Sequence, residues 1–163
     1  MSKKALVAVI MGSDSDLPVM DEAVKILKEY DVPSEVKILS AHRSPEDVAR
    51  FAAAARKRGI KIIIAGAGGS AHLAGVIASL TTIPVIGVPM ETKELKGIDS
   101  LFSTVQMPSG VPVATVSIGK SGAKNAAILA LEILGLEDDR IAKRLEAFKK
   151  NLVREVRAKN KKL

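Results

Sequence analysis

Short apolar runs alternate along this chain with longer segments in which apolar residues recur at helical spacing. Residues 5–11 are apolar throughout, and such a run is typical of a strand buried on both faces of a parallel sheet. Further strands are predicted at 34–39, 61–65, 83–88 and 111–118. Each predicted strand is followed by a segment with a helical pattern, so the chain repeats a strand–helix unit.

The predicted helices fill the intervals between these strands and the end of the chain. They cover about residues 17–30, 45–59, 71–80, 98–105 and 121–134, and a last helix follows Asp138 or Asp139, either of which can cap it. This alternation implies a three-layer α/β/α fold. Its sheet is five-stranded, parallel and flavodoxin- or Rossmann-like, with helices on both faces and an extra C-terminal helix.

The length of 163 residues suits one domain, and no linker or internal repeat divides it. We therefore expect a single domain over residues 1–163. The segment 138–163 carries an apolar stripe from Ile141 to Val156, although the preceding chain already covers its sheet. We expect this C-terminal helix to pack on a neighbouring subunit.

Composition and charge narrow the function classes. The net charge is +7, but residues 140–163 alone carry ten Lys or Arg and two Glu, so the rest of the chain is almost neutral. With aromatic residues at 2%, this pattern indicates a solvated basic helix rather than a nucleic-acid-binding surface. No apolar run reaches the roughly eighteen residues that cross a membrane, and residues 5–11 are too few for a signal-peptide core. The lack of cysteine fits a reducing cytoplasm.

One turn between a predicted strand and a predicted helix carries the most distinctive chemistry. Ser40, His42 and Arg43 lie there, and Ser44 followed by Pro45 marks the start of the helix. The carboxyl ends of strands in open α/β sheets bind ligands, and a helix start favours anions. A lone histidine is more often structural than catalytic, but a histidine beside an arginine in such a turn favours a functional role.

Two further loops are expected at the same edge of the sheet. The first, at 12–16, offers the hydroxyls of Ser13 and Ser15 for a phosphate and the carboxylate of Asp16 for a ribose diol, although Asp16 could simply cap the next helix. The second, at 66–72, is rich in glycine and ends at His72. Together the loops predict an anion pocket with a titratable imidazole, which suits proton transfer on a phosphorylated small molecule.

Other known motifs match less well. The loop at 66–71 formally fits the dinucleotide fingerprint G-x-G-x-x-G/A, but it follows the third strand rather than the first. Gly119-Lys120-Ser121 lacks the first glycine of a Walker loop, because position 114 is alanine. With no cysteine and with its two histidines thirty positions apart, the sequence predicts no metal site. No G-x-S-x-G elbow supports a serine hydrolase.

Several of these segments together resemble one family, the N5-carboxyaminoimidazole ribonucleotide mutases of purine synthesis (class I PurE). The similar segments are Met11-Gly-Ser-x-Ser-Asp16, Ser40-Ala-His-Arg43, Ala65-Gly-Ala-Gly-Gly-Ser-Ala-His-Leu73, Asp99-Ser-Leu-Phe-Ser103 and Gln106-Met-Pro-Ser-Gly-Val-Pro-Val113. They run in unbroken order over roughly residues 5–150. Two positions depart from the usual family pattern, Leu17 in place of tryptophan and Ala74 in place of proline, and neither removes a polar group.

The resemblance implies an isomerase that moves a carboxylate from N5 to ring carbon C4 without metal, ATP or another cofactor. It implies that His42 shuttles the proton and that Arg43 and Ser40 bind the phosphate. Contacts to phosphate and ribose would come from Ser13, Ser15 and Asp16. The loop with Gly68, Gly69, Ser70 and His72 would surround carbon dioxide and the aminoimidazole ring. Members of the family are homo-octamers with sites at subunit contacts.

Two alternatives remain open. A related carboxylase uses aminoimidazole ribonucleotide and carbon dioxide directly, but it usually carries lysine after the histidine, where this chain has Arg43. A catalytically silent nucleotide-binding module would keep the serine and glycine loops but would not need His42.

Overall fold

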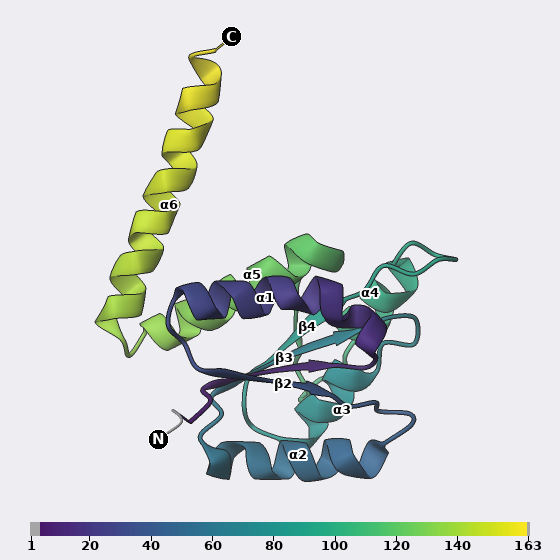
Figure 1. The fold of residues 1–163 in the computed structure, drawn as a ribbon. Helices are drawn as coiled ribbons and strands as arrows, with labels where there is room; N and C mark the ends of the chain where they lie inside the picture. The colour runs from purple at the N-terminus through teal and green to yellow at the C-terminus, as the bar shows by residue number, and fades with distance from the viewer. Residues whose placement is uncertain (1–3, 163) are drawn as a thin grey trace. The chain divides into compact units, whose positions relative to one another are not determined.

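The computed structural model describes residues 4–162 and contains one parallel sheet (Figure 1). Its strands are β1 (Val7–Met11), β2 (Ser34–Ile38), β3 (Ile62–Ala67), β4 (Val85–Pro89) and β5 (Ala114–Thr115). They lie in the order β2-β1-β3-β4-β5, and every neighbouring pair is parallel. This is the five-stranded α/β sheet that the strand–helix alternation predicts.

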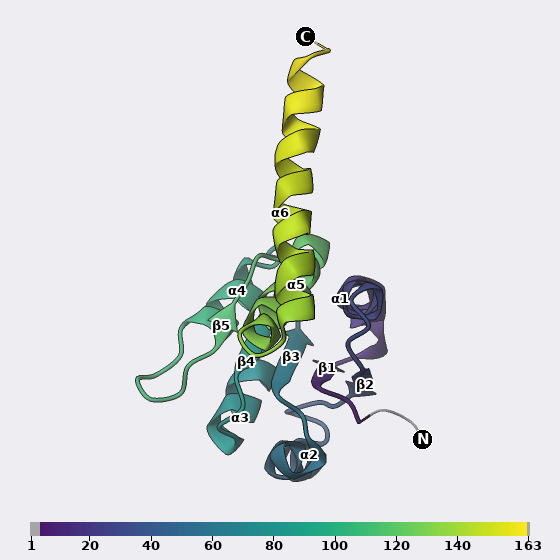
Figure 2. The ribbon, with the colours of Figure 1, turned by 90° about the vertical axis from the view of Figure 1, so that its left-hand side faces the viewer.

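Helices cover both faces of this sheet (Figure 2). The bounds are α1 (Leu17–Glu29), α2 (Pro45–Arg58), α3 (Leu73–Leu80), α4 (Ile98–Val105), α5 (Gly119–Gly135) and α6 (Asp139–Asn160), with a short 3₁₀ helix at Asp14–Asp16. Helices α2 and α3 lie on one face, and α1 lies on the other. The chain forms two compact units, of which the first extends to Ala130 and the second begins at Leu131.

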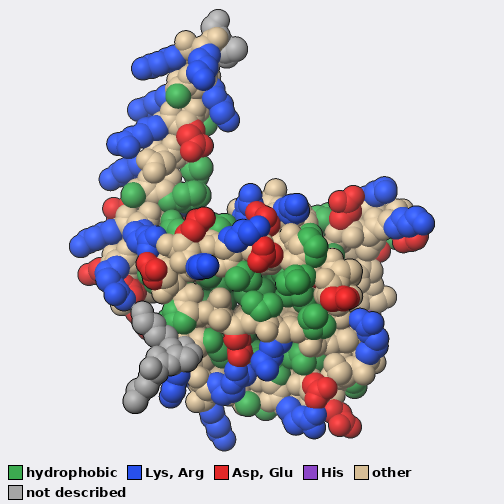
Figure 3. Space-filling view, in the orientation of Figure 1, with side chains coloured by type: hydrophobic (Ala, Val, Ile, Leu, Met, Phe, Trp, Pro, Cys, Tyr) green, Lys and Arg blue, Asp and Glu red, His purple; other side chains and the backbone are tan. Residues whose placement is uncertain are grey.

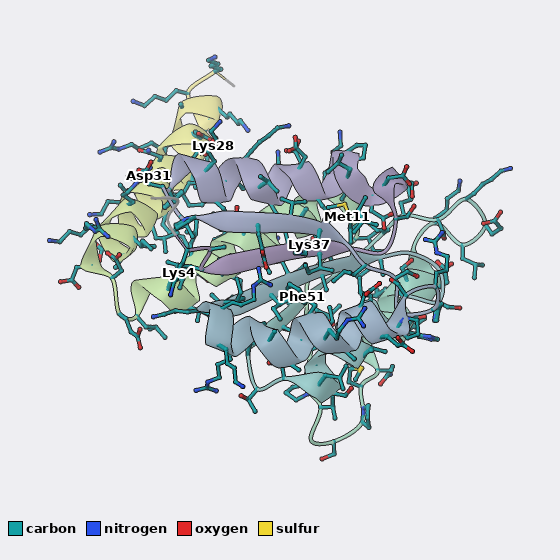
Figure 4. All side chains as sticks on the ribbon, turned by 60° about the horizontal axis from the view of Figure 1, so that its bottom comes forward. Lys4, Met11, Lys28, Asp31, Lys37 and Phe51 are labelled. Carbon is teal, nitrogen blue, oxygen red and sulfur yellow. The ribbon has the colours of Figure 1, made fainter. Side chains whose placement is uncertain are left out.

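The core of the first unit forms where apolar strand residues meet the apolar faces of these helices. All residues of β1 and β4 are buried, as a strand covered on both faces requires. On one face, Ile10 and Ile63 pack in a cluster with Ala52 of α2 and Ile77 of α3. Phe51 of α2, labelled in Figure 4, joins the same cluster.

Strand β5 is shorter than the predicted strand at 111–118. Only Ala114 and Thr115 pair with β4. Pro112 has no backbone N–H to donate to a ladder, and the Val111 N–H bonds instead to the Pro108 carbonyl at 3.2 Å. Pro112 therefore removes a ladder donor at the start of the predicted strand, ahead of the two residues that pair at this edge of the sheet.

The second unit holds the end of α5 and the whole of α6. Asp138 caps α6, because its Oδ1 accepts from the Arg140 N–H at 3.0 Å, and hydrogen bonding from the Arg140 side chain lowers the pKa of this carboxyl. Along the predicted stripe, Ile141 and Leu145 are each 7% exposed, whereas Val156 is 58% exposed. The stripe is thus buried at its start and exposed towards its end.

Candidate active site

A pocket of about 460 Å³ lies at the carboxyl ends of the strands. The sheet order places β1 between β2 and β3, so the chain reverses direction across the sheet at β1, and ligands bind at such switch points. The volume suits a small-molecule ligand. The pocket is lined by Gly12, Ser13, Ser15, Asp16, Ser40, Ala41, His42, Arg43, Ala67, Gly68, Ser70, His72, Leu73, Met90 and Glu91.

The predicted site residues are brought together with one exception. The three loops that follow β1, β2 and β3 all contribute to the lining, as expected for strands that end at the same edge. Gly69 alone among the predicted residues is not part of the lining, and its peptide N–H is directed to Ser100 of α4 instead.

His42 and His72 form a direct pair across the pocket. The Nε2 atom of His42 lies 2.9 Å from the Nδ1 atom of His72, and the rings meet edge to face with centroids 4.9 Å apart. A hydrogen bond at this distance needs a hydrogen on one nitrogen and a lone pair on the other. When His42 Nε2 donates, the Nδ1 atom of His42 can take up a further proton without breaking the pair.

Hydrogen bonds hold the Arg43 side chain against the loop that follows β1. Its Nη2 donates to the Gly12 carbonyl at 2.9 Å, and its Nε and backbone N–H both reach Ser40 Oγ, at 3.4 and 3.1 Å. Two of the five guanidinium N–H groups are engaged in this way, so the others can bind an anion. Arg43 also lines an adjoining pocket with Ser13 and Ser40, which extends the site along the anion-binding loops.

The start of α2 matches the prediction, although the side chain of Ser44 does not cap the helix as a serine at this position usually does. Pro45 is the first residue of the helix, and Ser44 takes the N-cap position without a side-chain capping bond. Its Oγ instead donates to the Ser40 carbonyl at 3.2 Å and accepts from the Ser40 N–H at 3.1 Å. The Ser44 hydroxyl therefore closes the turn that carries His42 and Arg43. Serine side chains often bond to nearby backbone groups in this way in place of a helix-capping bond.

The loop after β1 orients its polar groups around two carboxylates. Asp14 Oδ1 accepts from Ser13 Oγ and from the Ser15 N–H, each at 3.0 Å. Asp16 precedes α1 and makes no side-chain capping bond, so capping does not account for this carboxylate. Burial raises the pKa of the Asp16 carboxyl above its usual range, against the opposing effect of hydrogen bonds from the Ser13 backbone and the Ser15 hydroxyl.

We expect Asp16→Asn to raise the melting temperature at pH 7 to 8. A carboxyl whose pKa is raised by folding favours the folded state only while it is protonated, and that contribution is lost as the pH rises through its pKa. The neutral amide avoids the cost of the buried charge. The gain should shrink as the pH falls towards the range in which Asp16 protonates, and thermal melts at several pH values measure it.

Asp21→Asn, on the same helix, is the matched control, since the Asp21 side chain is 46% exposed and pairs with Lys25. Asp21→Asn should not raise the melting temperature at neutral pH. A melting temperature of Asp16→Asn that is equal to or below that of the parent at pH 8 would contradict the assignment of a costly buried charge.

The loop after β3 depends on glycine at two positions. A Cβ at Gly66 would overlap the side chains of Met20 and Met90, so β3 ends in close contact with its neighbours. Gly69 has a φ of +68°, a left-handed conformation that costs other residues roughly 1–2 kcal/mol. These positions let the backbone turn sharply and place Ser70 and His72 in the pocket lining.

Met90 and Glu91 were not among the predicted site residues, although both line the pocket. They directly follow β4, which ends at Pro89. The same rule that places the first three loops at one edge also places these residues there. The position of the fourth predicted strand was thus the signal that could have identified them.

Within residues 4–162, no group of three or more His, Cys, Asp or Glu side chains could hold a metal ion. The same residues include no helix that is both long and apolar enough to span a bilayer.

Comparison with known proteins shows the family. The model of the AIR carboxylase family matches residues 6–155. N5-carboxyaminoimidazole ribonucleotide mutase of Pyrococcus horikoshii is 59% identical over 99% of this chain and 90% of its own length, and that of Bacillus subtilis is 56% identical over 90% of each. The crystal structure of Treponema denticola PurE, 28% identical, covers 98% of both chains with a TM-score of 0.86. This chain therefore belongs to the AIR carboxylase family.

Proposed function

We propose that this protein is an N5-carboxyaminoimidazole ribonucleotide mutase, a cytoplasmic enzyme of de novo purine synthesis. The observation that carries the proposal is the pocket in which an imidazole pair and an arginine meet at the switch point of the sheet. Curated relatives with this activity in their names, at 53–59% identity, support it.

The polar groups of the pocket suggest how the ribonucleotide lies. Its phosphate binds the unengaged N–H groups of Arg43 together with the hydroxyls of Ser13 and Ser15, all near a helix start that favours anions. The carboxylate of Asp16 accepts from the ribose hydroxyls. The aminoimidazole ring then reaches the pair of His42 and His72, with Gly68 and Ser70 beside it.

The reaction is a rearrangement whose atoms and electrons balance within the substrate. The bond between N5 and the carboxylate carbon breaks, N5 gains a proton, and carbon dioxide is held in the pocket. Ring carbon C4 then forms a bond to the carbon of carbon dioxide and loses its own proton. The proton lost from C4 replaces the one gained by N5, so the chemistry calls for one acid–base group and no redox partner.

His42 fits this acid–base role. Its Nδ1 takes the proton from C4 and supplies one to N5, while its Nε2 donates to His72 Nδ1. The imidazolium that forms keeps a hydrogen-bond acceptor 2.9 Å away, so the pair holds the ring in one orientation during the transfer.

Isotope transfer tests the proposed function. We expect N5-carboxyaminoimidazole ribonucleotide to be converted without added bicarbonate. Substrate labelled in its carboxylate should pass most of the label to product even in excess unlabelled bicarbonate, because a mutase must retain its carbon dioxide until C4 attacks.

The two alternatives give different results. A direct carboxylase would wash out the label, or would turn over aminoimidazole ribonucleotide at low carbon dioxide and leave the carbamate unused. A silent binding module would turn over neither compound, and its binding of both would be unchanged in His42→Asn. Arg43, where the carboxylases usually carry lysine, favours the mutase.

We also propose that the protein works as a homo-octamer. On α4, Ile98, Phe102 and Val105 share one face and are 49%, 59% and 46% exposed. A second apolar surface lies on the edge strand β2, where Ile38 is 54% exposed, and Figure 3 shows hydrophobic side chains gathered between α1 and α2. Apolar stripes of this kind are typical of subunit contacts. The bare later turns of α6 would likewise pack on a neighbouring subunit.

Phe102→Glu should therefore lower the particle mass measured by light scattering, because it places a charge in an apolar contact. Asn125→Glu, an exposed polar position on α5, is the control and should leave the mass of an octamer. A monomeric parent, or an octamer in both variants, would show that α4 is not part of a subunit contact.

A further inference from the structure

Ser100 is a fully buried serine that the proposed mechanism does not use. It lies in the first turn of α4, within the segment Asp99–Ser103, and its exposed fraction is 0%. Its Oγ accepts a hydrogen bond from the backbone N–H of Gly69 at 2.9 Å. The segment that follows β4 and the loop that follows β3 are thus joined through one buried hydroxyl.

The Gly69 peptide is held on its carbonyl side as well. Its oxygen accepts from the Ala71 N–H at 2.8 Å and lies 3.2 Å from Ser103 Oγ. The single proton of Ser103 also reaches the Asp99 carbonyl, at the shorter distance of 2.7 Å. Of the two serines, Ser100 therefore provides the dedicated contact to the loop.

The first turn of α4 is itself anchored to the wall of the pocket. Thr92, directly after the lining residue Glu91, donates to Asp99 Oδ1 at 2.7 Å and accepts from the Gly97 N–H at 3.1 Å. These bonds fix the helix start from which Ser100 reaches Gly69. Ser100 therefore projects from a helix whose first turn is held by hydrogen bonds to Thr92.

Gly69 is linked to His72 by a short run of backbone hydrogen bonds. Between them the chain makes two tight contacts, Ala71 N–H to the Gly69 carbonyl and His72 N–H to the Ser70 carbonyl, each at 2.8 Å. The His72 carbonyl accepts from Val76 N–H as α3 begins. His72 thus lies between α3 and the residue that Ser100 holds, and its ring meets His42.

We propose that Ser100 is a positioning residue of the enzyme, which holds the Gly69 peptide so that His72 stays in hydrogen-bond contact with His42. The inference rests on the proposed function, since it concerns the acid–base pair of that reaction. A shift of about 1 Å in a catalytic group can lower the rate by about two orders of magnitude, so a distant hydroxyl can matter for turnover.

The test compares Ser100→Ala with Thr104→Val. Thr104 is also buried on α4, at 3% exposed, but its hydroxyl donates to the Ser100 carbonyl within the same helix and does not touch the loop. We expect Ser100→Ala to lower kcat by about ten- to a hundredfold with KM within about threefold of the parent, because the loop moves the acid–base pair and not the phosphate site. Thr104→Val should keep a kcat within about twofold.

Hydrogen exchange gives a readout that does not depend on turnover. The fragment that contains residues 66–72 should exchange faster in Ser100→Ala than in the parent, since Gly69 N–H loses its acceptor. Ser100→Cys has a similar volume and a weaker acceptor, so the exchange rate of this fragment should lie between those of the parent and Ser100→Ala. It tests the proposal if Ser100→Ala does not fold.

Three results would overturn the proposal. These are a parent-like kcat in Ser100→Ala, unchanged exchange of the 66–72 fragment, and an equal loss of kcat in Thr104→Val. Failure of the proposed function itself is distinguishable, because the parent would then not isomerise the substrate at all.

Discussion

His42→Asn is expected to lower turnover by about two to four orders of magnitude, the usual contribution of a positioned acid–base group. Asparagine keeps a polar side chain of similar reach but cannot take up a proton near neutral pH. The substituted side chain would also leave His72 Nδ1 without the ring nitrogen that now lies 2.9 Å away. Initial rates from the ultraviolet absorbance of the carboxylated product measure the effect.

Substrate binding should change little in the same variant. The proposed phosphate ligands, Arg43, Ser13 and Ser15, are untouched, so inhibition by free phosphate serves as the internal control. Turnover within a few-fold of the parent would show that His42 is not the acid–base group. A loss of phosphate inhibition would instead indicate a collapsed site.

Arg43→Ala is expected to weaken substrate binding by about ten- to a hundredfold, because hydrogen bonds to a charged group contribute roughly 1.5–3 kcal/mol. The same change frees the Gly12 carbonyl and Ser40 Oγ, which the guanidinium now contacts. Since Gly12 and Ser40 line the proposed phosphate site and not the acid–base pair, KM should rise much more than kcat falls. Inhibition by inorganic phosphate should weaken in parallel.

Arg50→Ala is the matched control. Arg50 is an exposed arginine on α2 that pairs with Asp47 and does not line the pocket. It should leave KM unchanged. If Arg43→Ala binds phosphate and substrate like the parent, Arg43 is a surface charge and the phosphate must bind elsewhere.

Elements with a regular apolar pattern could be predicted closely. The helix expected at 98–105 is α4, Ile98–Val105, and the buried run at 5–11 contains β1. The strand expected at 111–118 shrinks to Ala114–Thr115, and at its start Pro112 lacks the backbone donor that the apolar pattern takes for granted. The apolar pattern indicates the type and bounds of an element, but it does not report which backbone groups are free to pair, nor that the apolar face of α4 is exposed.

The candidate site could be predicted as a set of loops but not as a set of contacts. Strand order alone brings the loops to one edge of the sheet. The contact between His42 and His72 joins residues thirty positions apart and depends on side-chain directions in irregular turns. Ser100 lies in one of the segments that resemble the family, but its burial could not be predicted, since a buried serine and an exposed one look alike in a helix.

The tethering of Arg43 has a consequence for the entropy of ligand capture. A free arginine side chain loses about 1.5–2 kcal/mol of rotamer freedom when it is immobilised. Here the Gly12 carbonyl and Ser40 Oγ already hold the guanidinium, so most of that ordering takes place during folding. An arriving phosphate meets a preorganised receptor, and more of its interaction energy remains as affinity.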